Sequence, residues 1–500
     1  MPFSPLPLPR RIPARMSAFK VIGPNMVLQQ GIPAPIWGWA DAGEEVSVKF
    51  ADQEKKVSAG QDGSWMVKLD ALEASAEPRD LVIAGKNTMT LGNVLVGEVW
   101  VCSGQSNMEW SVGGSDNGQQ EIAAANFPKI RLFHIPKTTA GRPQPDVNAD
   151  WKECSPQTVG GFSAVGYFMG RKLHQELDVP VGLINTSWGG TRIEPWCTLA
   201  SFEANPALAD IAKRVKQTLP ETPEGKETYA GALAQIEAWL PQARAALDEG
   251  KPLPNMPGLP RELTGNQDPC ALYNAMVHGI VPFGIRGAIW YQGESNMGEG
   301  MLYYEKSKAL VDGWRKAWGQ GEFPFQITQI APFQNYGDGA LPAFWEAQDR
   351  VVQDVPNTGI AGTGDISNLA DIHPRNKQDV GLRHALWALA NTYGKKDIVW
   401  RGPRIKDAKL GGATAEVSFD HAGTGLSTRD GKAPDWFQVA GEDKNFVDAK
   451  AEITGDNTVA VSAEGIGKIA AVRFGWKKTA EPNLQNKEGL PAYPFRTDSW

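Results

Sequence analysis

The chain has 500 residues and a formal net charge of −7, with 41% hydrophobic and 21% charged residues. This length is enough for two to four domains, and the composition is typical of a folded globular protein rather than a disordered one. The negative charge argues against an extended nucleic-acid-binding surface. No apolar run approaches the roughly 18–20 residues that a membrane-spanning helix needs.

We treat residues 1–18 as an N-terminal tail, because the chain begins with a proline- and arginine-rich stretch that lacks the apolar segment of a signal peptide. The cysteines are widely spaced and form no C-x-x-C motif, so they do not support a zinc or redox site. Disulfides are permitted, but buried free thiols are the simpler interpretation. The four cysteines are Cys102, Cys154, Cys197 and Cys270.

Residues 19–94 contain short β-prone segments separated by turn signals, at 34–39, 45–50, 64–69 and 80–84. Strands at this spacing are typical of a small β-sandwich, and nothing in the segment resembles a catalytic motif. A second β-prone region with turn-rich connectors covers residues 398–500. We therefore expect a β domain at each end of the chain.

Residues 95–397 alternate between apolar strands and helices, which indicates an α/β domain with a parallel sheet covered on both faces. The helix beginning after Ser163, a candidate cap, repeats apolar residues every four positions. Residues 205–268 interrupt this rhythm with an Ala- and Glu-rich helical insertion, which either roofs a cleft or is a surface excursion. The expected strands are 95–101, 181–186, 285–291, 324–331 and 358–362, and further expected helices include 344–352 and 377–393.

The first strand of this domain ends abruptly in Ser103-Gly104 and is followed by Gln105, Ser106 and Asn107. Such a change places small polar side chains at the carboxyl edge of the sheet, where α/β enzymes hold ligands. Ser106 is therefore our candidate nucleophile, and it needs a base within hydrogen-bond reach that is itself oriented by an acid.

Among the six histidines, His373 is the candidate base, because it lies in the loop after the last predicted strand, with Asp371 two residues away. An Asp in an irregular loop can accept from Nδ1 of the imidazole and leave Nε2 for the serine. The alternative is that Asp371 and His373 only cap the helix that follows Pro374. Beside the Ser106 motif we favour the catalytic interpretation.

Two further loops follow predicted strands. In the loop after residue 291, the Gln292 amide could donate to an oxyanion, Glu294 is more simply a loop-orienting carboxylate, and Ser295 is a weaker rival nucleophile. In the loop after residue 186, Gly190 could supply a second oxyanion N–H, or the glycines could only form a tight turn. Arg192 could contact substrate or pair with Glu194 or Glu294.

Together these loops resemble the SGNH hydrolases, and among them the sialate O-acetylesterase-like carbohydrate esterases. The matching motifs are Gly104-Gln105-Ser106-Asn107-Met108, Ser187-Trp188-Gly189-Gly190-Thr191, Tyr291-Gln292-Gly293-Glu294-Ser295 and Asp371-Ile372-His373-Pro374.

The resemblance implies a flavodoxin-like α/β/α domain flanked by β domains, and a periplasmic or secreted location. It implies removal of acetyl groups from sugar hydroxyls by Ser106, His373 and Asp371, with Gly190 and Gln292 at the oxyanion hole and no cofactor or metal. Asn107, Arg192 and Glu294 would bind substrate or orient loops. The one-residue gap in Asp371-x-His373 is shorter than is usual in SGNH hydrolases, and Gln292 stands where an asparagine is common.

The expected partner is an acetylated glycan, either sialic acid or a plant polysaccharide such as xylan or xyloglucan. We see no arginine clamp for a carboxylate, which favours neutral glycans. The alternatives are a lipid or small-ester esterase of the same fold and a carbohydrate-binding protein without catalysis. The 18 tryptophans would suit either a core or stacking on sugar rings.

Overall fold

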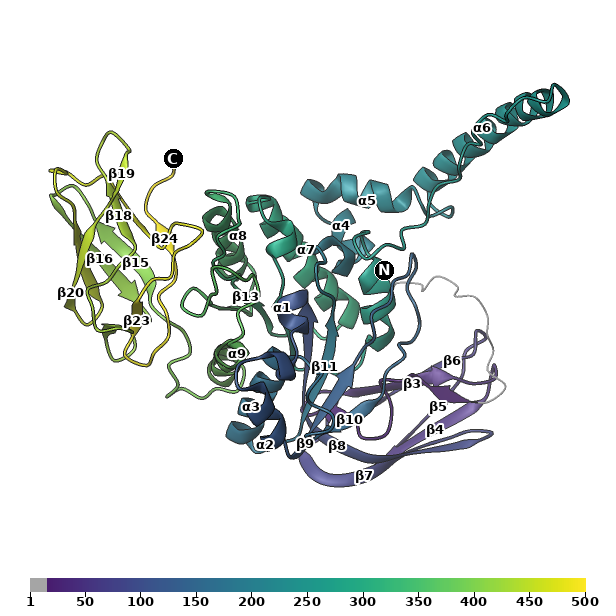
Figure 1. The fold of residues 1–500 in the computed structure, drawn as a ribbon. Helices are drawn as coiled ribbons and strands as arrows, with labels where there is room; N and C mark the ends of the chain where they lie inside the picture. The colour runs from purple at the N-terminus through teal and green to yellow at the C-terminus, as the bar shows by residue number, and fades with distance from the viewer. Residues whose placement is uncertain (1–15) are drawn as a thin grey trace.

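The computed structural model describes residues 16–500, so residues 1–15 of the expected tail lie outside the described residues. A mixed α/β body lies between an N-terminal β region and a separate C-terminal β region (Figure 1). The nine α-helices within the described part are α1 (Ser106–Glu109), α2 (Gly118–Ala124), α3 (Ala164–Leu177), α4 (Leu199–Glu203), α5 (Ala209–Lys216), α6 (Pro223–Asp248), α7 (Met301–Trp318), α8 (Ala340–Asp354) and α9 (Lys377–Asn391).

The N-terminal β region is joined directly to the central sheet by the 17-residue strand β8 (Thr88–Gly104). The first half of β8 pairs with β7, and its second half is the middle strand of the parallel sheet. The expected boundary between residues 94 and 95 therefore falls inside one strand. The other strands of this region are β1 (Ser17–Ala18), β2 (Val27–Gln29), β3 (Ala34–Trp39), β4 (Glu45–Phe50), β5 (Gln53–Ser58), β6 (Ser64–Leu69) and β7 (Ser75–Ala84).

The central sheet has the strand order β10-β9-β11-β8-β12-β13-β14, and only β10 runs antiparallel to its neighbour along this path. Taken in chain order, β8, β11, β12, β13 and β14 have the 2-1-3-4-5 arrangement of flavodoxin-like folds. This confirms the expected fold class. The strands after β8 are β9 (Phe127–His134), β10 (Trp151–Cys154), β11 (Val181–Ser187), β12 (Gly287–Tyr291), β13 (Phe325–Thr328) and β14 (Thr358–Ala361).

Helices cover both faces of this sheet, with α3 packed on α9 and α7 packed on α8 (Figure 1). Helix α3 begins at the expected cap, where Ser163 Oγ accepts a hydrogen bond from the Gly166 N–H at 3.2 Å. The four cysteines are buried and free, as the simpler interpretation of their spacing predicted. Within residues 16–500, no helix combines the length and the apolar character needed to cross a membrane.

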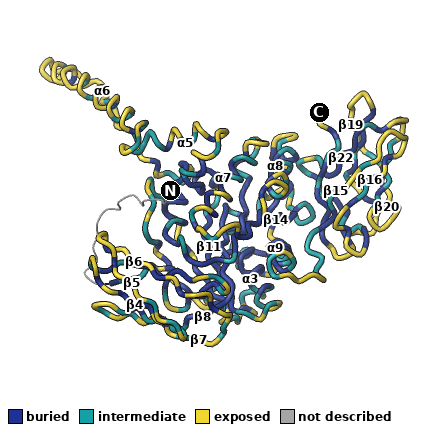
Figure 2. Tube along the Cα trace, turned by 180° about the vertical axis from the view of Figure 1, so that it is seen from behind, coloured by how far each residue is buried: buried dark blue, intermediate teal, exposed yellow. Residues whose placement is uncertain are grey.

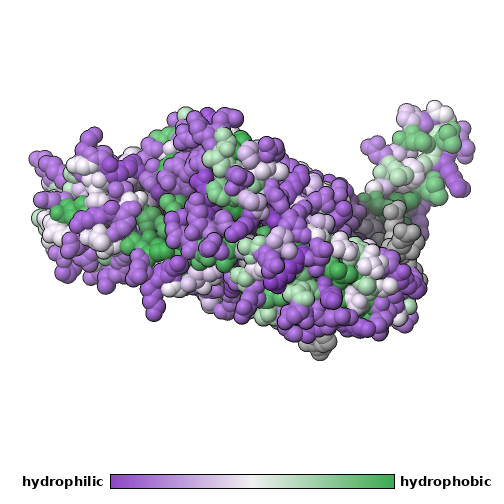
Figure 3. All heavy atoms as spheres, turned by 90° about the horizontal axis from the view of Figure 1, so that it is seen from below, coloured by the Kyte–Doolittle hydropathy of each residue, from purple (hydrophilic) through white to green (hydrophobic). Residues whose placement is uncertain are grey.

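The 205–268 insertion contains α5 and the long helix α6, which projects away from the body of the molecule (Figures 1 and 2). The returning chain packs against α6, where Trp239 Nε1 donates to the Pro254 carbonyl at 3.0 Å. Apolar side chains remain exposed along this arm (Figure 3), including Leu233, Leu240 and Leu247. Most of the arm is a surface excursion rather than a roof, although its last residues reach the candidate site.

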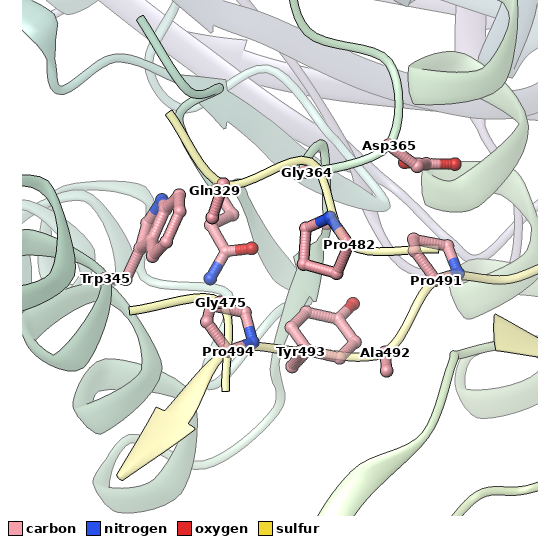
Figure 4. Close-up of a pocket in the computed structure, with 12 residues that line it drawn as sticks. Gln329, Trp345, Gly364, Asp365, Gly475, Pro482, Pro491, Ala492, Tyr493 and Pro494 are labelled. Atoms are coloured by element: carbon pink, nitrogen blue, oxygen red, sulfur yellow. The ribbon is translucent and has the colours of Figure 1, made fainter. Parts of the chain in front are cut away.

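The C-terminal β region has a hydrophobic core of its own and packs against the α8 and β14 side of the central domain. Tyr493 Oη donates to the Ile360 carbonyl of β14 at 2.9 Å. Figure 4 shows Tyr493, Pro482 and Pro494 against Trp345 and Gln329, around a void of about 10 Å³. A void of this size has room for about one water molecule, so this interface is closely packed.

The strands of the C-terminal region are β15 (Arg404–Lys409), β16 (Thr414–Asp420), β17 (Leu426–Thr428), β18 (Phe437–Ala440), β19 (Phe446–Asp448), β20 (Lys450–Gly455), β21 (Thr458–Ser462), β22 (Ala471–Phe474), β23 (Leu484–Asn486) and β24 (Phe495–Arg496).

Gly104→Ala tests the backbone that ends β8. Gly104 has φ +141°, and a Cβ there would lie 2.1 Å from the Tyr291 carbonyl oxygen, so β8 and β12 must separate to admit it. We expect the free energy of unfolding to fall by at least about 2 kcal/mol, measured by urea denaturation. Gly161→Ala is the matched control, because a Cβ there meets no atom within 4 Å. Equal unfolding midpoints for the two variants would contradict the prediction.

Candidate active site

The candidate residues lie in loops at the carboxyl ends of neighbouring parallel strands. Ser106 follows β8, the Trp188–Gly190 turn follows β11, and Gln292 follows β12. The 363–376 loop, which carries Asp371 and His373, follows β14. In the 2-1-3-4-5 order, β8 and β12 flank the point where the strand order reverses, and open α/β sheets bind ligands at this point.

Ser106 is the first residue of α1, immediately after the extended end of β8. Gly189 packs directly against it, since a Cβ on Gly189 would lie 3.2 Å from Ser106 Cβ. The Gly189 N–H donates to Glu109 Oε2 at 2.6 Å, which fixes the turn over α1. The absence of a side chain at Gly189 therefore brings the backbone of this turn next to the serine.

Ser106 and His373 are in hydrogen-bond contact, with 2.8 Å between Ser106 Oγ and His373 Nε2. On the other side of the ring, His373 Nδ1 lies 3.3 Å from Asp371 Oδ1. The same carboxylate oxygen accepts the backbone N–H of His373 at 3.0 Å, so Asp371 folds back on its own loop. The Trp110 ring stacks on the imidazole, with centroids 5.1 Å apart. The structure therefore brings the three expected residues together in the expected order.

The alternative interpretation of the loop, that Asp371 and His373 cap the following helix, does not hold. Helix α9 begins at Lys377, and its cap is Asn376, whose side chain accepts from the Asp379 N–H at 3.1 Å. Asp371 and His373 make no such contact. They are also partly exposed, with side-chain exposures of 49% and 27%, so a ligand can reach them.

Asn107 ties the nucleophile segment to the base loop. Its side-chain amide donates to the Ile372 carbonyl at 3.1 Å and to Glu294 Oε1 at 2.6 Å, and its Oδ1 accepts from Lys377 Nζ at 2.5 Å. Asn107 and Lys377 are both completely buried. Through these contacts Asn107 and Glu294 connect the nucleophile segment, the loop after β12 and the base loop.

Lys377 was not recognised in the sequence, and it lies between the aromatic rings beneath the site. Its Nζ is 5.2 Å from the Tyr291 ring centroid and 5.9 Å from that of Trp110. Burial lowers the pKa of Lys377 to about 7, although the Glu294 carboxyl opposes this shift. Burial likewise raises the pKa of Glu294. A lysine in the first turn of a predicted helix is normally solvated, so only the tertiary structure reveals this one.

Gln105 holds the loop after β12 in place. Its Oε1 accepts the backbone N–H groups of Gly293 and Ser295, each at 3.3 Å, and its side chain is buried. Gln105 immediately precedes Ser106, so one residue couples the nucleophile to the neighbouring loop. Its place in the motif was noted in the sequence, but this role was not.

The position of Gln292 differs from the expectation that its amide donates to an oxyanion. Its Nε2 donates to the Thr191 carbonyl at 3.1 Å and to Asn296 Oδ1 at 2.8 Å, which uses both amide hydrogens. Its Oε1 accepts from Tyr303 Oη at 2.9 Å. Because both amide hydrogens are donated to protein groups, Gln292 braces the two loops in this structure.

Gly190 follows Gly189 in the turn after β11. It has φ +74°, which favours glycine, and its carbonyl accepts from Gln267 Nε2 at 2.8 Å. Gln267 Oε1 in turn accepts the Arg192 N–H at 3.1 Å. The end of the 205–268 insertion therefore braces the turn that carries Gly190, a role that residue spacing alone could not indicate.

Arg192 is held by carboxylates rather than being free for substrate. Its guanidinium contacts Glu194 and Glu299, and its Nη1 donates to the Ser295 carbonyl at 3.1 Å. Buried Lys306 bonds the same two carboxylates, at 2.6 and 2.7 Å. Of the two alternatives for Arg192, the structure favours pairing with Glu194, and the second partner is Glu299 rather than Glu294.

Lys377→Met tests the burial of this amine through the pH dependence of stability. Burial lowers the pKa of Lys377 from 10.5 to about 7 in the folded chain. Between these two pH values the Lys377 amine is therefore protonated in the unfolded chain but not in the folded chain. The free energy of unfolding of the parent, relative to the variant, should therefore rise with pH across this window, by up to about 1.4 kcal/mol per pH unit.

Below about pH 7 both states of the parent carry the proton, so the difference between parent and variant should become constant. Denaturant unfolding of both chains at several pH values measures it. Parallel stability curves above neutral pH would show that Lys377 titrates alike in the folded and unfolded chains.

Comparison with known proteins gives a consistent result. A family model described as a carbohydrate esterase, sialic acid-specific acetylesterase, matches residues 96–231 and 264–389. The sialate O-acetylesterase of Rattus norvegicus is 31% identical over 77% of this chain and 75% of its own length. That of Mus musculus is 28% identical over 94% of this chain and 92% of its own.

Among solved structures, a carbohydrate acetylesterase from Xanthomonas citri superposes with a TM-score of 0.81 at 33% sequence identity, covering 97% of this chain and 100% of that one. The family match and the curated relatives confirm the resemblance noted in the sequence, and this neighbour shares the fold. The chain therefore belongs to the sialic acid-specific acetylesterase family of carbohydrate esterases, and it is a carboxylic-ester hydrolase.

Proposed function

We propose that this chain removes O-acetyl groups from glycans by acyl transfer through Ser106, with His373 as the general base and Asp371 as the group that orients the imidazole. The 2.8 Å contact between Ser106 Oγ and His373 Nε2 is the observation that carries this proposal. Asp371 on the Nδ1 side favours the tautomer that leaves Nε2 free to accept the serine proton.

In the first step, Ser106 Oγ bonds to the acetyl carbonyl carbon while its proton moves to His373 Nε2. The tetrahedral intermediate collapses as the bond to the sugar oxygen breaks, and the imidazolium returns its proton to that oxygen. Water then attacks the acetyl-enzyme, with His373 again taking and returning one proton, and acetate leaves.

For the oxyanion we propose backbone donors, namely the N–H groups of Ser106 and Gly190. Ser106 begins α1, so its N–H has no partner within the helix. Gly190 lies in the turn that packs on Ser106 through Gly189, and Gln267 holds the Gly190 carbonyl on the other side of the residue. Gln292 then acts indirectly, by holding Thr191 and Asn296 so that this turn keeps its position.

For the substrate we propose a neutral acetylated glycan such as xylan or xyloglucan, with an acetylated sialic acid as the second candidate. The second candidate is supported by the names of the curated relatives. The first is favoured because two cations of the neighbouring loops are engaged, Arg192 by two carboxylates and Lys137 by Glu109 at 2.5 Å. Either substrate fits a periplasmic or secreted location, which is part of the same proposal.

Ser106→Ala tests the nucleophile. We expect kcat for 4-nitrophenyl acetate to fall by about 10³-fold or more, since loss of a nucleophile leaves only binding and oxyanion stabilisation. The variant should unfold at the same denaturant concentration as the parent. Released nitrophenol measures turnover, and acetate assay on acetylated xylan and an acetylated sialoside separates the two substrate candidates.

Ser295→Ala is the matched control, because Ser295 is the rival serine of the neighbouring loop and is expected to retain activity. Near-normal turnover in Ser106→Ala, or a loss confined to Ser295→Ala, would contradict the assigned nucleophile. A parent chain without turnover on any acetate ester would instead favour the carbohydrate-binding alternative.

A further inference from the structure

A polar cleft of about 560 Å³ lies beside the loop that carries Asp371 and His373. Its walls come from four parts of the chain: the 366–376 loop, the segment before α2, the segment between β13 and α8, and the C-terminal β region. We call it the 366–376 cleft. The lining residues used below are Asp116, Gln334, Leu369, Pro374, Arg375 and Glu481.

The cleft offers hydrogen-bonding groups that the protein itself does not use. Among residues 16–500, no partner of the Gln334 side chain is found. The hydrogen bond found there for the Arg375 side chain runs from Nε to the Gly114 carbonyl at 3.2 Å. Asp116 and Gln334 are exposed at the cleft. Amide, guanidinium and carboxylate groups together supply the donors and acceptors that sugar hydroxyls need.

The cleft is also a fixed structure rather than a chance gap between two domains. Ser367 Oγ donates to Glu481 Oε1 at 2.5 Å, and Arg429 Nη2 donates to the Glu481 carbonyl at 2.8 Å. The closely packed interface around Tyr493 joins the same two parts of the chain. Glu481 therefore keeps one position relative to the 366–376 loop.

The position of the cleft relates it to the reaction. Pro374, which lines the cleft, directly follows His373, so its Cα lies about 3.8 Å along the chain from that of the base. The volume falls within the roughly 300–1,000 Å³ of pockets that hold small ligands. Half-buried Ile366 and Leu369 add apolar surface on which the C–H face of a sugar ring can rest.

We propose that the 366–376 cleft binds a neutral sugar unit of the glycan, next to the unit whose acetyl group is removed at Ser106. Two carboxylates, Asp116 and Glu481, against one guanidinium, Arg375, give the lining a negative balance that disfavours an acidic sugar. The proposal rests on the proposed function and adds that the C-terminal β region contributes to substrate binding.

The test uses Gln334→Trp in the full-length chain, with Asn335→Trp as the matched control. Gln334 is exposed in the cleft, whereas Asn335 is the next residue, is also exposed, and does not line the cleft. We expect the ratio of kcat/KM for an acetylated xylo-oligosaccharide to that for 4-nitrophenyl acetate to fall at least about tenfold in Gln334→Trp, mainly through KM. Glu481→Ala should lower the same ratio.

Equal ratios in the Gln334 and Asn335 variants would overturn the proposal, as would a loss seen for an acetylated sialoside but not for the xylo-oligosaccharide. If the parent hydrolyses neither the acetylated xylo-oligosaccharide nor 4-nitrophenyl acetate, the proposed function fails. Calorimetry with xylotetraose then tests whether the cleft binds sugar. Binding by the parent that is weakened in Gln334→Trp would support a sugar site without catalysis. Unchanged or absent xylotetraose binding would reject the site.

Discussion

The hydrogen bond between Ser106 and His373 joins residues 267 positions apart, and the central sheet is what makes it possible. Parallel strands end at one edge, so β8 and β14 deliver their loops to the same side although β12 and β13 lie between them. The base loop then crosses towards β8, where Asn107 holds the Ile372 carbonyl. The Ser106–His373 contact thus depends first on the strand order of the sheet and then on the buried Asn107 side chain.

Many polar side chains around the site form hydrogen bonds or ion pairs with other protein groups and are not free to bind a ligand. Gln105, Gln292 and Gln267 each bridge two backbone segments, and Arg192 lies in a cluster with two glutamates and a lysine. Buried polar groups cost free energy unless they are paired, so such braces exclude alternative loop conformations. The loops at the carboxyl edge of the sheet are therefore preorganised, which suits stabilisation of a developing oxyanion by fixed backbone N–H donors.

Apolar strand patterns sufficed to predict β8, β11, β12, β13 and β14, and the motifs after four of them located the loops of the site. They did not reveal β9 and β10, because β9 starts with exposed residues near the rim and β10 has four residues only. The place of Gln292 after a predicted strand suggested that its amide donates to an oxyanion. The sequence cannot show that both amide hydrogens bond to other protein groups. Lys377 escaped notice for a related reason, since its burial arises from segments far away in sequence.

The continuity of β8 affects how this hydrolase can be dissected. A fragment started at residue 95 would strip the partners β2 and β7 from the strand that leads to the serine. It would also remove Gln29 and Gln30, which bond the fully buried Glu98 carboxylate together with Arg286. The smallest fragment that folds as an esterase therefore includes the N-terminal strands. In a chimera, the N-terminal β region and the central α/β domain should come from the same parent protein.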